Sequence, residues 1–532
     1  MTAEPVTVSI TRHIDPGHPE PVCLLLGLGA EEHALHQTGH GDVDCPRHPP
    51  IQPETGPLVD PVGVSDEPDP RRWRILAVTL MVGFMSLLDV TIVNVAIPSM
   101  RTGLDTTAGT VQWVVSGYAL AFGLTLVAGG RLGDAVGRRR MMLIGLSGFI
   151  VSSAAVGLAP NIELVIAARL AQGATAGLLT PQNTGLIQQL FRGAERGRAF
   201  GFFGLTVSIS SGLGPIIGGL ILAAAGEDQG WRFLFLVNVP IGLVALVAIA
   251  LMVPGLAAQP DRDTRLDLVG AALLGLGVLC VLFPLVSLEG GARLPLVLLV
   301  LAPAFLAGFV QWERRVVRTG GAPILDVGLL RRTPGYAGGL AIQTLYFTGF
   351  TGIFLVLSVY LQDGLGLAPL AAGLLITPFA LGSAVTAPLA GRLVSVVDRR
   401  ITIISLTVMM TGVLGATVLV PGREPGDLWW VMVPTLLLAG LGGGGVISPN
   451  FTLSLAEVPP AMGGAAGGAL QTGARIGSAI GAALLMTSYQ LVETPPGDAL
   501  RAALFTALGV LAVAMVMAVR DLRVAGGSVL PS

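Results

Sequence analysis

The stretch that decides the fold is Leu88-Asp-Val-Thr-Ile-Val-Asn-Val-Ala-Ile-Pro98. It places a carboxylate, Asp89, inside an apolar segment that is long enough to cross a bilayer. A charge at that depth is costly, so it normally faces a cavity or a partner and marks the path of an ion or a substrate. The segment therefore predicts a membrane protein with a functional group inside the membrane.

The composition of the whole chain agrees with this prediction. Of its 532 residues, 52% are hydrophobic and 12% are charged, whereas soluble proteins carry roughly 25% charged residues. The sequence contains no lysine, which excludes a P-loop ATPase and a lysine Schiff base. All six histidines precede residue 50, so none is available for a metal site or proton relay in the apolar region. A net charge of −2 and the lack of a basic tract give no indication of nucleic-acid binding.

Fourteen segments are apolar and long enough to be transmembrane helices. They cover residues 75–98, 109–130, 140–159, 162–190, 198–225, 231–254, 266–288, 293–313, 336–361, 370–391, 401–420, 429–448, 462–489 and 501–520. With this count, 22 arginines lie in or beside the loops on the side of the N-terminus and 5 on the other side. Because arginine accumulates in cytoplasmic loops, both termini are expected in the cytoplasm.

Residues 1–70 differ from the rest, being rich in proline, histidine and acids. The composition predicts a disordered cytoplasmic tail, or upstream sequence added by a misassigned start. A metal-binding tail is the alternative, although the spacing of Cys23, Cys45 and the histidines matches no zinc pattern. The third cysteine, Cys280, stands alone in an apolar span, so no disulfide framework is implied.

A degenerate repeat divides the apolar region. The loop Gly130-Arg-Leu-Gly-Asp-Ala-Val-Gly-Arg-Arg139 is echoed by Gly391-Arg-Leu-Val-Ser-Val-Val-Asp-Arg-Arg400, and each copy follows the second span of a six-span block. Two similar halves around a midplane site are typical of transporters. The predicted fold is an all-α integral membrane protein with two six-helix bundles and two extra central helices. The expected domains are a tail (1–70), a first bundle (71–254), two helices with a linker (255–335), a second bundle (336–523) and a C-terminal tail (524–532).

Several motifs together carry a family resemblance. The chain resembles the major facilitator superfamily, and within it the fourteen-span drug:proton antiporter branch, over about residues 71–523. The motifs are the first-span stretch Leu88–Pro98, the loop Gly130–Arg139, Arg169-Leu-Ala-Gln172-Gly173 in the fourth span, Gly214-Pro215-Ile-Ile-Gly218-Gly219 in the fifth, and Trp231-Arg232 through Gly242. One departure is Arg475-Ile476, where an Arg-Gln pair is common in this branch.

The resemblance implies a role for each group of residues. Asp89 and Arg169 are the predicted proton-coupling pair; a purely structural ion pair is the alternative. The loop residues Gly130, Asp134, Gly137, Arg138 and Arg139 are predicted to form a cytoplasmic latch, with Asp134 near a helix N-terminus and the arginines paired with acids; a positive-inside anchor is the alternative. Gly214, Pro215, Gly218 and Gly219 are predicted to bend the fifth span, or simply to pack closely. The candidate cavity residues are Gln172, Asn183, Gln343, Tyr346 and Arg475.

The predicted function is proton-coupled export of amphiphilic, drug-like or antibiotic molecules across the cytoplasmic membrane. The expected partners are the small molecule, protons and the bilayer, with the protein acting as a monomer and without nucleic acid, metal or cofactor. One deep acid and two deep arginines favour neutral or anionic substrates. A dedicated transporter of a single metabolite and a transport-dead sensor remain alternatives. A membrane enzyme is disfavoured, because histidine and clustered carboxylates are missing from the spans.

Overall fold

The computed structural model describes residues 69–226, 229–255, 267–289, 294–321, 323–492 and 495–527. The predicted tail 1–70 lies outside this part of the chain except for its last two residues. Every regular element in the described part is a helix. The long helices are α1 (Arg72–Gly103), α2 (Ala108–Val136), α3 (Arg138–Gly157), α4 (Ile162–Leu190), α5 (Gly193–Ala225), α6 (Gly230–Leu236) with α7 (Asn238–Met252), α8 (Leu268–Glu289), α9 (Ala302–Arg318), α11 (Pro334–Val359), α12 (Pro369–Val397), α13 (Arg400–Leu419), α14 (Leu428–Ser454), α15 (Gly463–Gln490) and α16 (Pro496–Gly527).

These helices form fourteen rods that match the fourteen predicted spans in order. Only Val237 separates α6 from α7, the 3-10 turn η1 (Leu294–Val300) leads into α9, and the π turn η2 (Tyr360–Gly364) ends α11. Short α10 (Leu329–Arg332) and η3 (Pro460–Met462) lie in connections. The predicted all-α membrane fold is confirmed.

Two details differ from the sequence prediction. Thirteen rods of the described residues are apolar enough to cross a membrane by composition, and α15 is not among them. Its many glycines, together with Gln471, Thr472 and Arg475, lower its hydropathy. In addition, α16 continues to Gly527, into the predicted tail 524–532, because a helix can extend beyond its apolar segment.

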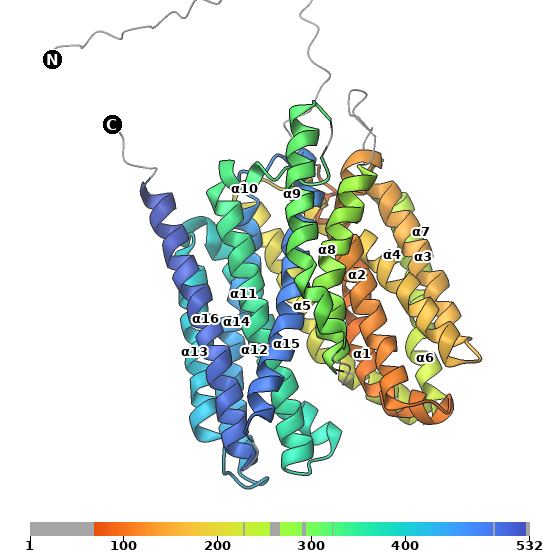
Figure 1. Cartoon of the computed structure of the whole chain (residues 1–532), viewed down its shortest axis with the longest axis vertical. Helices are drawn as coiled ribbons and strands as arrows, with labels where there is room; N and C mark the ends of the chain where they lie inside the picture. Colours follow the sequence, from red (N-terminus) through yellow and green to blue (C-terminus); the bar gives the residue numbers. More distant parts are fainter. Residues whose placement is uncertain are drawn as a thin grey trace, which may run out of the picture. The chain divides into compact units, whose positions relative to one another are not determined.

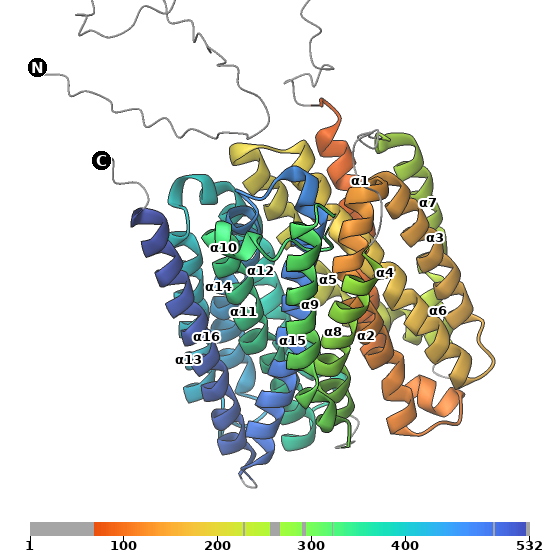
Figure 2. The same cartoon turned by 45° about the horizontal axis from the view of Figure 1, so that its top comes forward.

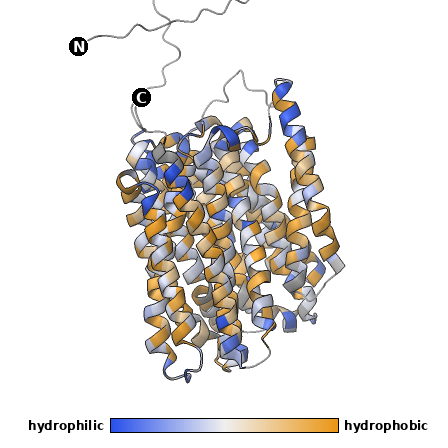
Figure 3. Ribbon diagram, turned by 60° about the vertical axis from the view of Figure 1, so that its left-hand side comes forward, coloured by the Kyte–Doolittle hydropathy of each residue, from blue (hydrophilic) through white to orange (hydrophobic). Residues whose placement is uncertain are grey.

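The rods pack as two groups. Helices α1 to α7 contact one another, as do α11 to α16, while α8 and α9 pair with each other and α8 lies against α2 and α15 (Figures 1 and 2). The two groups meet along two seams, α2 with α15 and α5 with α12. The outer surface is apolar: Leu220, Leu251 and Val396 are 66%, 78% and 83% exposed. Along the ribbon, hydrophobic residues are frequent in the bodies of the helices and strongly hydrophilic ones gather near their ends (Figure 3), as expected of a protein surrounded by lipid.

Both copies of the repeated motif have a residue of positive φ between their two helices. Gly137, between α2 and α3, has φ 105°, and Asp398, between α12 and α13, has φ 57°. A positive φ is uncommon for a residue with a side chain. The second copy therefore keeps a positive φ at this position, with a different ψ, although its glycine has been replaced.

Candidate transport site and conformational latch

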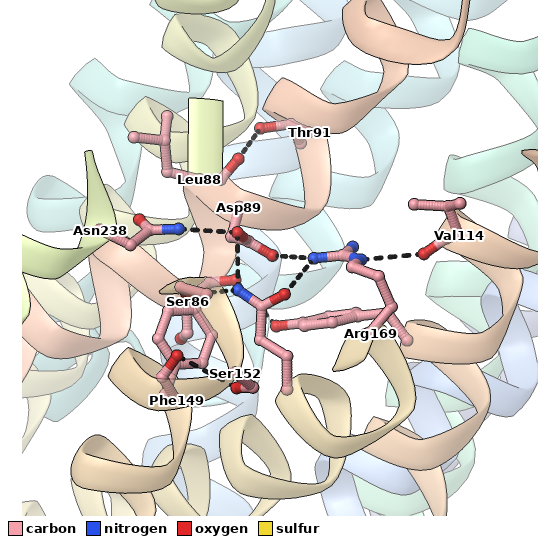
Figure 4. A network of polar contacts seen from close by, with 12 residues as sticks. Ser86, Leu88, Asp89, Thr91, Val114, Phe149, Ser152, Arg169 and Asn238 are labelled. Carbon is pink, nitrogen blue, oxygen red and sulfur yellow. Dashed lines mark hydrogen bonds and ion pairs between the residues drawn. The ribbon is translucent and has the colours of Figure 1, made fainter. Parts of the chain in front are cut away.

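Asp89 on α1 is the centre of a closed polar cluster (Figure 4). Its Oδ2 forms an ion pair with Arg169 Nη1 of α4 at 2.5 Å. Its Oδ1 accepts hydrogen bonds from Gln172 Nε2 at 3.1 Å and from Asn238 Nδ2, at the start of α7, at 2.8 Å. Gln172 Nε2 also donates to Ser153 Oγ of α3 at 2.7 Å. Side chains of α4 and α7 thus converge on the carboxylate of α1, and α3 joins the cluster through the bond between Gln172 and Ser153.

The guanidinium of Arg169 is held from three directions. Its Nη1 also donates to Gln172 Oε1 at 2.7 Å, and its Nε donates to the carbonyl of Val114 on α2 at 2.9 Å. The ring of Tyr118 lies 4.2 Å from the guanidinium carbon, in cation–π range. Arg169 and Asp89 are each only 1% exposed. The pair is therefore fully enclosed and well satisfied.

The stability of this cluster depends on both charges of the Asp89–Arg169 ion pair. Removing one partner of a buried ion pair leaves an uncompensated charge and costs about 3–5 kcal/mol. Protonation of Asp89 would have the same effect on Arg169 as removing the carboxylate charge. Loss of either charge would therefore leave the other group buried without its counter-charge where α1, α4 and α7 meet.

The five predicted cavity residues lie in different surroundings. Gln172 has no exposed surface and completes the Asp89 cluster instead of lining an open cavity. Asn183 is buried, with its amide against Gly83 and its Oδ1 unpaired among the described atoms. Tyr346 is buried and donates to the Gly443 carbonyl at 3.0 Å.

Arg475 of α15 differs from the other predicted cavity residues. It is half-buried and stacks on Phe122 of α2, 4.7 Å from the ring centroid. Within the described residues, its guanidinium makes no hydrogen bond or ion pair. Arg475 is thus a cation deep between the two bundles without a neutralising acid.

Asp134, predicted in a loop but located in the last turn of α2, joins the two bundles. Its Oδ1 and Oδ2 accept from the backbone N–H groups of Gly464 (3.1 Å) and Ala465 (2.9 Å) in the first turn of α15. Arg138 forms an ion pair with Asp134 at 2.7 Å and donates to the Pro460 carbonyl at 2.8 Å, also in the second half. A carboxylate at a helix N-terminus satisfies unpaired N–H groups and interacts favourably with the helix dipole.

Other contacts close the same end of the molecule. Gln188 of α4 donates to the Leu455 carbonyl at 2.6 Å, and Phe451 of α14 packs on Phe200 and Phe203 of α5 with ring centroids 5.7 and 5.5 Å apart. The two bundles are therefore sealed together at their arginine-rich ends.

Arg139 does not pair with an acid in the described part of the chain, contrary to the prediction. It donates to the Ala250 carbonyl in the last turn of α7, where a cation is favourable. Gly130, at the α2–α15 seam, leaves no room for a side chain beside the Gly464 carbonyl.

The predicted antiporter motif lies within α5, which is continuous through residues 214–219. Gly214 packs tightly on Thr91 of α1, and Gly218 is buried, whereas Gly219 faces open space. The side chain of Pro215 lies outside the described part. A bend at this motif stays a prediction.

A second buried polar chain lies in the other half, and the sequence reasoning found only one of its members, Gln343. Arg399 forms an ion pair with Asp521 of α16 at 2.6 Å and donates to Asn450 Oδ1 at 2.9 Å. Asn450 in turn donates to Gln343 Oε1 at 2.9 Å. Burial lowers the pKa of the Arg399 guanidinium, and the carboxylate of Asp521 opposes this shift.

The sequence matches the Major Facilitator Superfamily over residues 79–482 and again over residues 339–527. The chain belongs to the major facilitator superfamily. It is 39% identical to the probable actinorhodin transporter of Streptomyces coelicolor, over 82% of this chain and 76% of that protein. It is 36% identical to the puromycin resistance protein pur8 of Streptomyces alboniger, over 79% and 82% of the two chains. The superfamily expectation is confirmed, and the relatives are transporters and resistance proteins, not enzymes.

The fold of this superfamily member also matches solved structures. The human organic anion transporter MFSD10 (TETRAN) superposes with a TM-score of 0.63 at 18% identity, over 84% of this chain and all of that one. The protein is therefore a multi-pass membrane transporter of small molecules, and bacterial relatives place such proteins in the cell membrane.

Proposed function

We propose that this protein is a proton-driven exporter of amphiphilic, drug-like or antibiotic molecules, working as a monomer with both termini in the cytoplasm. The observation that carries the proposal is the enclosed Asp89 carboxylate at the meeting point of α1, α4 and α7. The names of the relatives, which include a tetracenomycin C resistance and export protein from Streptomyces glaucescens, support the choice of substrate class and direction.

Asp89 and Arg169 are proposed to couple protons to movement. When Asp89 is ionised, Arg169, Gln172 and Asn238 all donate to it, which holds α1, α4 and α7 together. A proton on Asp89 weakens these contacts and lets the helices shift. One charge crossing about 100 mV supplies about 2.3 kcal/mol, which is enough to bias such a change and requires no bound cofactor.

The position of the Asp89–Arg169 pair supports proton entry from the outside of the cell. Arg169 is seven residues after Ile162, where α4 begins, so it lies about 10 Å along the axis from that end. The arginine-rich opposite ends are sealed by the Asp134 and Arg138 contacts. With cytoplasmic termini, this arrangement is a state closed on the cytoplasmic side, and external protons reach the enclosed Asp89 only when the helices around it move.

Arg475 is proposed to select substrate charge. Arg169 is already neutralised by Asp89, so Arg475 supplies an unpaired positive charge, and the neighbouring Phe122 offers an aromatic face. Neutral or anionic aromatic molecules suit this pair better than cations do.

The test is efflux from cells that lack their own drug pumps. Fluorescein (anionic), puromycin and ethidium (cationic) would be compared with and without a protonophore, in wild type and Arg475→Gln. The proposal expects protonophore-sensitive export of several compounds and a selective loss of fluorescein export in Arg475→Gln. Export of a single compound favours a dedicated transporter, and binding without flux favours a sensor.

A further inference from the structure

The two seams between the bundles share a close glycine contact but differ in their charged groups. In the first seam Gly130 of α2 lies against the backbone of Gly464 on α15, and in the second its repeat partner Gly391 of α12 lies against Gly197 of α5. In both places the backbones are too close for a side chain. The first seam also holds the carboxylate of Asp134, bound to the first turn of α15.

At the second seam, the described residues of the repeated motif contribute no carboxylate, and the acid in the first turn of α5, Glu195, pairs with Arg72 of α1. Ser395 stands where the first copy has Asp134, and its hydroxyl donates weakly to the carbonyl of Arg392 in its own helix. The first turn of α5 has no side-chain cap from its N-cap residue, Arg192. The second copy of the motif therefore contributes no carboxylate to bind the first turn of α5.

A pocket of about 290 Å³ opens at this second seam. It is lined by Arg198 and Phe202 of α5 and by Pro388 and Arg392 of α12. Both arginine side chains are exposed, and within the described residues neither guanidinium forms a hydrogen bond or an ion pair. Two cations thus face one cavity without a counter-charge.

The surface beside the pocket is apolar. Val385 and Leu389 are 57% and 47% exposed and precede Arg392 by seven and three residues, so they share its face of α12. Phe202, four residues after Arg198, continues the apolar surface on α5. These exposed apolar side chains thus form a strip that runs from the two arginines toward the middle of the membrane.

We propose that this pocket binds the phosphate group of an anionic membrane phospholipid. Arg198 and Arg392 hold the phosphate from the two bundles, and the acyl chains lie along Val385, Leu389 and Phe202. Arginine suits this task because its planar fork donates two hydrogen bonds to phosphate oxygens. A free phosphate would satisfy the charges but leave the apolar strip uncovered. The lipid supplies at this seam the negative charge that Asp134 supplies at the other, and it stabilises the sealed arrangement.

The experiment is lipid titration of the purified full-length protein in detergent, followed by native mass spectrometry. Dioleoylphosphatidylglycerol is the probe, and dioleoylglycerol, which lacks the phosphate, is the comparison. The pocket variant is Arg198→Gln with Arg392→Gln. The matched control is Arg314→Gln with Arg331→Gln, which removes two exposed arginines elsewhere.

The proposal expects wild type and the control variant to bind phosphatidylglycerol at least 10-fold more tightly than the pocket variant does. It also expects wild type to prefer phosphatidylglycerol over dioleoylglycerol at least 10-fold, a comparison that needs no variant. Equal binding by the pocket variant, or equal binding of dioleoylglycerol, would overturn the proposal. Displacement of the lipid by inorganic phosphate at equal concentration would show a free-anion site and overturn it as well.

Discussion

The substitution Asp134→Asn tests whether the α2–α15 contact acts as a latch. The carboxylate accepts from at least three donors, Arg138 and the N–H groups of Gly464 and Ala465. Two of these donors lie in the other bundle, so their energy contributes mainly to the sealed state. Asparagine keeps the size of the side chain and one acceptor oxygen but removes the charge.

The magnitude follows from the contacts that cross between the bundles. The Arg138–Asp134 ion pair lies within the first bundle, so the energy specific to the sealed state is that of the two N–H groups bound to the carboxylate, about 1.5–3 kcal/mol for a hydrogen bond to a charged group. Arg138 keeps its contacts to the Gly185 and Pro460 carbonyls, and the asparagine oxygen keeps one N–H partner. The net loss from the sealed state is then about 2–3 kcal/mol, so opening becomes roughly 30- to 160-fold more favourable.

The assay is a distance distribution between spin labels at Arg140 and Val396, two exposed positions at the arginine-rich ends of the two halves. The native cysteines are replaced first. Asp134→Asn should add a longer-distance population that wild type lacks. The matched control is Asp498→Asn, which breaks an exposed ion pair with Arg501 worth about 0–1 kcal/mol and should leave the distances unchanged. Unchanged distances in Asp134→Asn would refute the latch.

Three further predictions concern other contacts. Gly391→Val places a side chain against the backbone of α5, so the same label pair should again report separation; a wild-type distance would contradict the close packing. Asp521→Asn leaves Arg399 buried with Asn450 as its one side-chain partner among the described residues. Thermal unfolding in detergent should then show a free energy of unfolding lower by about 1–3 kcal/mol, and an unchanged melting midpoint would argue against this ion pair. Asn238→Ala removes one donor to Asp89, worth about 1–2 kcal/mol, and should slow coupled efflux roughly 5- to 30-fold, while efflux at the wild-type rate would exclude a role for this donor.

The fold was largely predictable from the sequence because lipid imposes a simple length and hydropathy rule on every span. The hydropathy signal is weakest at α15, which was nevertheless predicted as a span, because its glycines and polar residues reflect packing between the bundles. The rule missed the helical extensions beyond the bilayer, such as α16 to Gly527, since hydropathy marks only the part inside the membrane.

The candidate site was predictable only in part. Asp89 and Arg169 stood out because a charge in an apolar span is rare, and the structure pairs them. Asn238 carried a usable signal, a polar residue in an apolar segment, but nothing in one sequence said that it meets Asp89 across 149 residues. Ser153 is a small polar residue in a helix with several others, so no local pattern could have selected it.

Cross-bundle contacts were the hardest to foresee. The partners of Asp134 and Arg138 are backbone groups of α15 and of the turn at Pro460, and backbone groups leave no trace in the sequence. The same limit explains Arg139, which was expected to meet an acid and instead lies at the end of α7.

The central claim is that Asp89 couples protons to export. The direct measurement uses purified wild type and Asp89→Asn in liposomes with an imposed pH gradient, a trapped pH dye, and fluorescein as the transported probe. The account predicts that wild type moves fluorescein against its gradient while protons move the other way, and that Asp89→Asn loses both fluxes but still binds fluorescein. Proton-driven accumulation at the wild-type rate by Asp89→Asn would contradict the account.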